Sequence, residues 1–305
     1  MKNGKVHSEE WITDARDYWW NKDYLELILK RYKLTNIETL ADIGCGKGYM
    51  TYKLIPLLKN IKKCFGRDIE ELHIKDANDK AKLFKNIKFD FKVKNAENLD
   101  ILDNTVDLSV CQTLLLHVNN PIDVIQEMKR ITKENGTIMA IETNNSINNL
   151  VANSIIGESN NEVIDNIDKT LDKLKFDLII QKGIYNLNEG YLSIGDYLPK
   201  LFVEAGLKNI EVSIVDKACS LVPPYDTDEK KARVKEMLDW IENSSAEFNY
   251  NQMLKYYLAG KGKKEDFDKY WDIQKEETEK IKEALQNETY VMPGGALMYI
   301  VTGIK

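Results

Sequence analysis

The chain has 305 residues, of which 43% are apolar and 30% charged, and its formal net charge is −6. This balance is typical of a soluble globular protein, and the negative charge argues against a nucleic-acid duplex as partner, because phosphate contacts need a basic surface. No stretch reaches the roughly twenty apolar residues of a membrane span, and the N-terminus lacks the apolar core of a signal peptide. The four cysteines form no C-x-x-C pair, so we expect reduced thiols, no metal site and a cytoplasmic location.

The first predicted element is a helix over residues 8–33, in which apolar and aromatic side chains recur at helical intervals. Its density of tryptophan indicates that the segment packs against the main domain. A second interpretation, compatible with the first, is a lid over a ligand, with Arg16, Tyr18 or Tyr24 reaching the bound molecule.

A glycine turn follows, and the rest of the chain is organised around it. Thr39–Ile43 is a short apolar strand that contains Asp42, and the segment from Tyr49 to Leu58 is predicted to be helical. Between them stand three glycines at alternate positions: Gly44, Gly46 and Gly48. A buried strand, a glycine turn and a helix N-terminus bind a nucleotide-like ligand in open α/β sheets, because glycine lets the backbone approach the ligand closely.

The second predicted strand, Lys63–Asp68, ends in an acid about twenty residues after the glycine turn, where a carboxylate accepts hydrogen bonds from a ribose diol. Ile69, the next residue, is a candidate to pack on an adenine face. A polar helix over 70–84 and a half-exposed strand over 87–93 come next, and a turn at 95–97 closes this unit.

Strand and helix continue to alternate. Val106–Cys111 is a fourth strand that runs into a loop at 112–118, Pro121 opens a helix through Arg130, and Thr137–Glu142 is a fifth strand. Connections this short favour a parallel sheet with helices on both faces.

The regular alternation stops after Glu142. Helical stretches are predicted near 147–156 and 160–180, and a further helix over 193–206 ends at Gly206. Later elements are a strand at 210–215, a charged helical block from 224 to about 289, and a last strand at 296–302.

The spacing of the glycines distinguishes between ligands. A dinucleotide fingerprint needs glycine at its first, third and sixth positions, but the sixth position counted from Gly44 is Tyr49. Asp42 followed by the alternate glycines instead resembles the first motif of the class I S-adenosylmethionine-dependent methyltransferases. Further motifs in the family's order, including Gly66–Ile69 and Val106–Leu108, extend the resemblance over about residues 38–142.

The resemblance implies a seven-stranded, mostly parallel Rossmann-like sheet in the order 3-2-1-4-5-7-6, with S-adenosyl-L-methionine as cofactor. It implies that Asp68 holds the ribose hydroxyls, that Asn95, Ala96 and Glu97 read the adenine, and that Gln112 flanks the methionine part. Asp42 either touches the ligand or only fixes the turn, and His117 is either a general base or a residue that orders its loop. The expected cofactor-binding residues are Tyr18, Asp42, Gly44, Cys45, Gly46, Asp68, Ile69, Asn95, Ala96, Glu97, Gln112 and His117.

The expected domain organisation has a cofactor-binding core interrupted by helical insertions that form a substrate lid on the carboxyl side of the strands. Its five parts are an N-terminal lid (1–36), the core (37–142), an insertion with the sixth strand (143–215), a second insertion (216–292) and the last strand (293–305).

The sequence therefore predicts methyl transfer to a small-molecule O, N or S acceptor, with no nucleic acid, membrane or metal involved. Two alternatives stay open. One is a nicotinamide-dependent oxidoreductase with an irregular fingerprint. The other is a protein of the same fold that binds S-adenosylmethionine without turning it over. The oligomeric state and the acceptor are not predicted.

Overall fold

Seven strands form one sheet in the order β3-β2-β1-β4-β5-β7-β6 in the computed structural model, which describes residues 13–146, 167–244 and 247–305. β1 to β5 are parallel, whereas β7 pairs antiparallel with both β5 and β6. This order confirms the predicted sheet. The strands are β1 (Thr39–Ile43), β2 (Lys63–Asp68), β3 (Lys88–Val93), β4 (Val106–Gln112), β5 (Thr132–Thr143), β6 (Lys208–Ile214) and β7 (Met298–Ile304).

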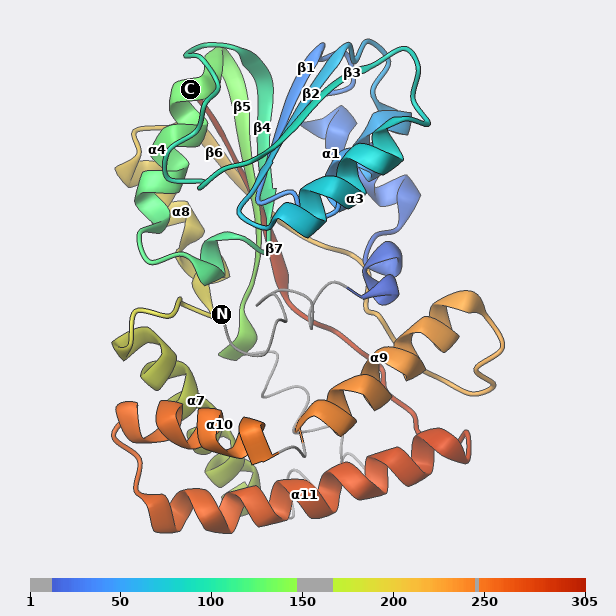
Figure 1. The fold of residues 1–305 in the computed structure, drawn as a ribbon, viewed down its shortest axis with the longest axis vertical. Coiled ribbons are helices and arrows are strands. Elements are labelled where there is room, and N and C mark those ends of the chain that lie inside the picture. The colour runs from blue at the N-terminus through green and yellow to red at the C-terminus, as the bar shows by residue number, and fades with distance from the viewer. Residues whose placement is uncertain (1–12, 147–166, 245–246) are drawn as a thin grey trace.

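Helices cover both faces of the sheet, as the alternating pattern predicts. α1, α2 and α3 pack on one face, and α4 and α8 pack on the other (Figure 1). Their bounds are α1 (Lys22–Arg31), α2 (Tyr49–Leu54), α3 (Glu71–Ala81), α4 (Pro121–Ile131) and α8 (Leu198–Glu204).

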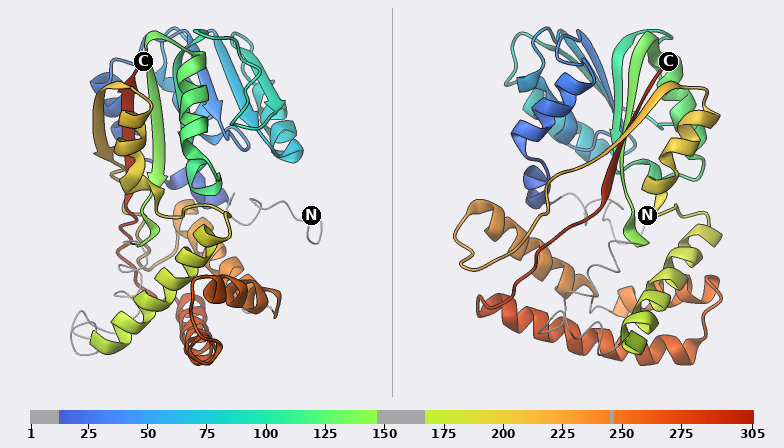
Figure 2. Two further views of the ribbon diagram at one scale, coloured as in Figure 1. Left: turned by 90° about the vertical axis from the view of Figure 1, so that its left-hand side faces the viewer. Right: turned by 180° about the vertical axis from the view of Figure 1, so that it is seen from behind.

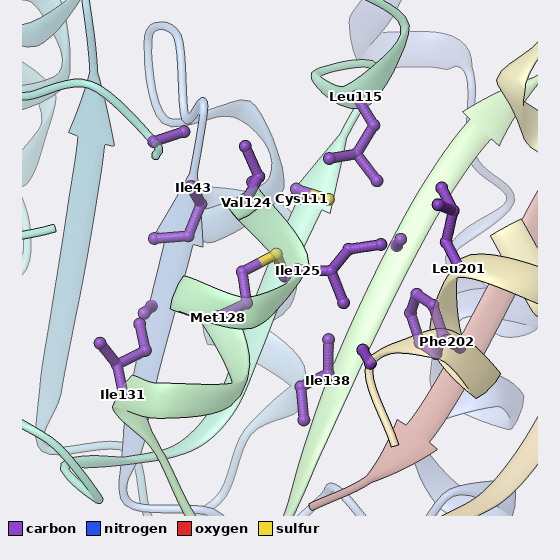
Figure 3. Close-up of a cluster of buried hydrophobic side chains, with 14 of the residues drawn as sticks. Ile43, Cys111, Leu115, Val124, Ile125, Met128, Ile131, Ile138, Leu201 and Phe202 are labelled. Atoms are coloured by element: carbon purple, nitrogen blue, oxygen red, sulfur yellow. The ribbon is translucent and has the colours of Figure 1, made fainter. Parts of the chain in front are cut away.

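The core on the second face is built by the apolar stripe of α4. Ile125 and Met128 on this helix point toward the sheet, where Ile138 of β5 meets them, and Phe202 of α8 closes the cluster from the side (Figure 3). All four side chains are fully buried. The burial of this stripe fixes how β4 and β5 stand relative to the helices, and with them the loops at the ends of these strands.

Three predicted helices are shorter or less regular than the sequence pattern indicates. The N-terminal one is a 3-10 turn, η1 (Asp14–Tyr18), followed by α1, because Asn21 between them is extended; its residues 8–12 lie outside the described part. α2 gives way to the 3-10 turn η2 (Ile55–Leu57) at Pro56, which lacks an N–H. The helix ending at Gly206 starts as the 3-10 turn η4 (Ile194–Tyr197), and Gly206 has the left-handed φ expected after a helix end.

The insertions form a helical layer facing the carboxyl ends of β1 to β5 (Figures 1 and 2). This layer contains α7 (Ile167–Asn186), α9 (Asp228–Ser244), α10 (Glu247–Ala259) and α11 (Lys264–Gln286). The stretch predicted to be helical at 147–156 lies outside the described residues. α7 and α10 cross closely, since a Cβ at Gly183 would collide with the backbone of Tyr256. The insertions therefore lie on the side of the sheet where open α/β folds bind ligands.

None of the helices in the described ranges has the length and apolar character that crossing a bilayer requires.

Candidate functional site

The glycine turn after β1 has a backbone conformation that only glycine adopts easily. Gly44, Gly46 and Gly48 have φ values of 67°, 51° and 79°, all in the left-handed region. A Cβ at Gly44 would stand 2.7 Å from a side-chain carbon of Leu114, in the loop after β4. The turn is thus pressed against the neighbouring loop, and its backbone forms one wall of the site.

Asp68 joins this turn to the end of β2. Its Oδ2 accepts a hydrogen bond from the Gly46 N–H at 2.7 Å, and its Oδ1 accepts one from the Glu70 N–H at 2.9 Å. Burial alone would raise the pKa of Asp68, but His73, whose Nδ1 lies 3.7 Å from Oδ1, and the hydrogen bonds from Glu70 and Gly46 outweigh burial and lower this pKa. Asp68 is therefore ionised at neutral pH. A carboxylate has about four acceptor positions, so two remain for the hydroxyls of a diol.

Asp42 fixes the turn from below. Its side chain is 1% exposed, and its Oδ2 accepts hydrogen bonds from the Thr51 N–H at 3.0 Å and the Thr51 Oγ1 at 2.7 Å. Burial raises the pKa of Asp42 to about 7, although the bonds from Thr51 oppose this shift. These bonds tie β1 to the start of α2, and contact of Asp42 with the cofactor stays a prediction. Cys45 is buried as well, and burial raises the pKa of its thiol.

The segment after β3 continues the same edge. The Lys94 N–H donates to the Asp68 carbonyl at 2.8 Å, which places residues 95–97 next to the acid. Asn95 Oδ1 accepts from the Glu97 N–H at 2.9 Å and closes the predicted turn, with Ala96 buried and Glu97 half-buried. Ile69 is 67% exposed beside Asp68. The Asp68 carboxylate is therefore flanked by the apolar side chain of Ile69 and by the polar turn at residues 95–97.

Arg16 reaches this edge from the N-terminal segment. Its Nη2 donates to Thr113 Oγ1 at 2.5 Å, and its guanidinium lies 4.6 Å from the ring centre of Trp19 and 5.8 Å from that of Tyr49. Burial lowers the pKa of Arg16, while Tyr49, Glu236, Glu142 and Asp42 oppose this shift. Tyr18 in the same 3-10 turn is half-buried. Tyr24 instead donates its hydroxyl to the Ile214 carbonyl at 2.6 Å and ties α1 to β6.

Glu142, at the end of β5, is a residue that the sequence does not single out. It is fully buried, and its Oε1 accepts from the Leu114 N–H at 2.8 Å and the Leu115 N–H at 2.6 Å. Within the described residues its Oε2 has no hydrogen-bond partner. Burial raises the pKa of Glu142 to about 8, against the opposing effect of these backbone bonds and of Arg16. The only sequence signal was an acid at the end of a buried strand.

The loop after β4 carries the remaining predicted residues. Gln112 is half-buried at the end of β4, one residue before Thr113, whose φ of 50° turns the chain sharply. His117 ends the 3-10 turn η3 (Leu115–His117) and its side chain is exposed. The glycine turn, Asp68, residues 95–97, Gln112 and Arg16 thus border one edge, and His117 lies further along the loop. In the ranges that the structure describes, no group of three or more His, Cys, Asp or Glu side chains is arranged to hold a metal ion.

The fold and this edge define a class of protein: an open α/β protein with an acid-and-glycine turn at the carboxyl edge of its sheet and a helical layer over that edge. Residues 35–169 match a family model described as a methyltransferase domain. Over this part of its length the chain is therefore similar to methyltransferase domains.

The chain is also similar to individual proteins, among them a methyltransferase and a cyclase. Demethylmenaquinone methyltransferase of Oceanobacillus iheyensis is 26% identical over 132 residues, which are 43% of this chain and 54% of that protein. The chain therefore spans about half the length of this curated relative. The crystal structure of the [4+2]-cyclase SpnF superimposes with a TM-score of 0.51 at 15% identity, covering 93% of this chain and 80% of that one. This second likeness shows the fold alone.

Proposed function

We propose that the protein transfers a methyl group from S-adenosyl-L-methionine to a small-molecule acceptor. The observation that carries the proposal is the ionised Asp68 carboxylate, bonded to the N–H of Gly46 and with acceptor positions left for a ribose diol. The family of the matched domain supports the same cofactor.

The residues at the carboxyl edge fit this cofactor part by part. Asp68 would hold the ribose hydroxyls, and the turn of Gly44, Cys45 and Gly46 would pass close to the chain that leads to the sulfur, since no side chain stands in its way. The exposed Ile69 and the segment Asn95, Ala96 and Glu97 would flank the adenine. Gln112, Tyr18 and the Arg16 cation would border the methionine end, where Arg16 complements a carboxylate.

The bound cofactor supplies an electrophilic methyl group on a sulfonium. The protein's part is to hold the acceptor atom in line with that methyl group and to exclude water, and alignment alone supplies much of the rate. Arg16 and the half-buried Tyr49 close the glycine turn from the N-terminal side. His117 stays a candidate base for acceptors that must lose a proton.

The helical layer formed by α7, α9, α10 and α11 is the part that would select the acceptor, because it faces the carboxyl ends of the strands (Figure 1). A small acceptor is favoured by the net charge of −6, which opposes binding of nucleic acid. The division into an N-terminal lid (1–36), a core and two lid insertions remains part of this proposal.

A transfer assay with methyl-labelled S-adenosylmethionine tests the proposal. The panel contains thiols, amines, phenols, carboxylates and a demethylated naphthoquinol, the last because of the curated relative's name. We expect the labelled methyl group to appear in one class of acceptor with the wild type, and this transfer to be lost in Asp68→Ala. Tight cofactor binding with no transfer to any class would favour a binding protein, and the cyclase neighbour shows that the fold also serves other chemistry.

A further inference from the structure

The second insertion contains a buried cation that the cofactor site does not use. Arg233 in α9 is 6% exposed, yet its Nε and Nη2 have no hydrogen-bond partner among the described residues. A buried guanidinium with unpaired donors is costly, and such groups are normally satisfied by a carboxylate, by ordered water or by a ligand. Arg233 therefore calls for a further partner.

Among the described residues that contact this group, two cations share one carboxylate, which leaves one positive charge in excess. Glu229 lies 3.8 Å from Arg233 Nη2, too far for a hydrogen bond, and its other oxygen accepts from Lys217 Nζ at 3.0 Å. One carboxylate thus serves two cations. The third neighbour is the Cys219 thiol, whose pKa is raised by burial against the opposing effect of Arg233, so this thiol stays neutral.

Arg233 is also close to the outside. Residues 215–221 alternate between half-buried or buried positions and exposed ones, as in an extended segment with one face inward. Lys217 and Cys219 are on the inward face, and both are only half-buried. Solvent therefore reaches both of these side chains.

The position of α9 connects this cation to the cofactor edge. One turn after Arg233, Glu236 accepts a hydrogen bond from the Thr13 hydroxyl, and α9 packs against η1, which carries Arg16. The segment 215–221 leaves β6 at the same edge of the sheet, and Asn21 donates to Asp216 at 2.9 Å. Arg233 therefore lies about one helical turn from Glu236, whose partner Thr13 directly precedes η1.

We propose that Arg233, with Lys217, forms an oxyanion subsite that takes an acidic group of the methyl acceptor. This proposal rests on the proposed methyltransferase function and narrows its substrate class. The excess of one positive charge matches the single negative charge of a carboxylate, and the two unpaired N–H groups of Arg233 match its two oxygens.

Binding of simple anions tests the subsite without knowledge of the acceptor. The full chain is melted in acetate, in phosphate and in chloride at equal ionic strength. Acetate should raise the melting midpoint of the wild type by about 2 °C over chloride, because a ligand that binds only the folded state stabilises it. A response to phosphate alone would point to a free phosphate instead of a carboxylate and overturn the assignment to an acidic acceptor.

Three variants make the result specific. Arg233→Met should lose the acetate response, Arg233→Lys should keep only part of it, and Lys231→Met, which removes an exposed cation from the same helix, should leave it unchanged. An acetate response that survives in Arg233→Met, or a wild type with no anion response, would overturn the proposal.

Calorimetric titration of S-adenosylhomocysteine into the same proteins separates the two claims. If the nucleoside binds equally to wild type and Arg233→Met while the anion response is absent, only the subsite fails. If the nucleoside does not bind the wild type, the proposed function fails.

Discussion

Two buried carboxylates, Asp42 and Glu142, face one arginine across the carboxyl edge of the sheet. Burial raises the pKa of Asp42 to about 7 and that of Glu142 to about 8, and Arg16 acts against both shifts. One oxygen of each carboxylate accepts hydrogen bonds from backbone N–H groups. Asp42 accepts from Thr51, and Glu142 accepts from Leu114 and Leu115. They hold the glycine turn and the loop after β4 in place, so we assign them positioning roles.

The raised pKa of Glu142 makes stability depend on pH. Between about 4.5, the usual pKa of this group, and about 8, the folded protein holds a proton that the unfolded chain releases. The free energy of unfolding therefore falls as pH rises through this window, by at most about 1.4 kcal/mol per pH unit for one group. Glu142→Gln removes this term, so its stability relative to the wild type should improve from pH 5 to 8 in urea titrations. Curves that stay parallel over this range would contradict the assignment.

Asp68 is expected to contribute to cofactor affinity directly. Asp68→Ala removes a charged acceptor and loosens the Gly46 N–H, and it should weaken S-adenosylhomocysteine binding by about 1–3 kcal/mol. Calorimetry measures this change, and Asp79→Ala, which removes an exposed acid from α3, is the matched control. Unchanged affinity in Asp68→Ala would show that the ribose is misplaced.

At the scale of elements, polar contacts tie the N-terminal segment to several other parts of the molecule, and three of them show the pattern. Arg16 donates to Thr113, Lys53 donates to the Asp17 carbonyl at 2.6 Å, and the Tyr24 hydroxyl donates to the Ile214 carbonyl. These contacts join η1 and α1 to α2, to the loop after β4 and to β6. In η1 only Ala15 is buried, whereas α1 buries Leu25, Ile28 and Leu29 in the core, so η1 is the part that can release without disturbing the core.

Arg16→Met should loosen this segment. The variant loses a hydrogen bond from a charged donor, worth about 1.5–3 kcal/mol, together with the aromatic contacts of the guanidinium. Chymotrypsin should cleave at Tyr18 to Trp20 faster than in the wild type, and S-adenosylhomocysteine should slow the cleavage of the wild type. Lys30→Met, which removes an exposed cation that pairs with Glu26 of the same helix, serves as control. Equal cleavage rates in the wild type and Arg16→Met would show that Arg16 does not hold the segment.

The sequence predicted the elements of the core well, because the hydrophobic periodicity and the positions of glycine and proline indicate the same boundaries there. Thr39–Ile43 is a strand with the predicted bounds, and Pro121 opens α4 as expected. The helix ends were less accurate. The break at Asn21 and the 3-10 turn at Pro56 depend on how the neighbouring elements pack, which a periodic pattern does not contain.

At the scale of the whole molecule, the family's motifs predicted the order of the strands in the sheet. They predicted only some of the residues of the candidate site. The spacing of Asp68 and of the three glycines identifies them as candidate site residues in the sequence. No such spacing identifies Glu142, Thr113 and Arg233, because their roles follow from contacts between segments as distant as residues 16, 113 and 236. The arrangement of the insertions over the sheet edge supplies those contacts, and residue types alone do not encode it.

The most direct test of the central claim is a titration of the full chain with S-adenosylhomocysteine and, separately, with NADH, followed by tryptophan fluorescence. Trp19 lies against the Arg16 guanidinium, which borders the proposed site, so a ligand there should change its emission. The account predicts saturable binding of one S-adenosylhomocysteine per chain, weakened in Asp68→Ala, and no saturable binding of NADH. Tight binding of NADH with no response to S-adenosylhomocysteine would contradict it.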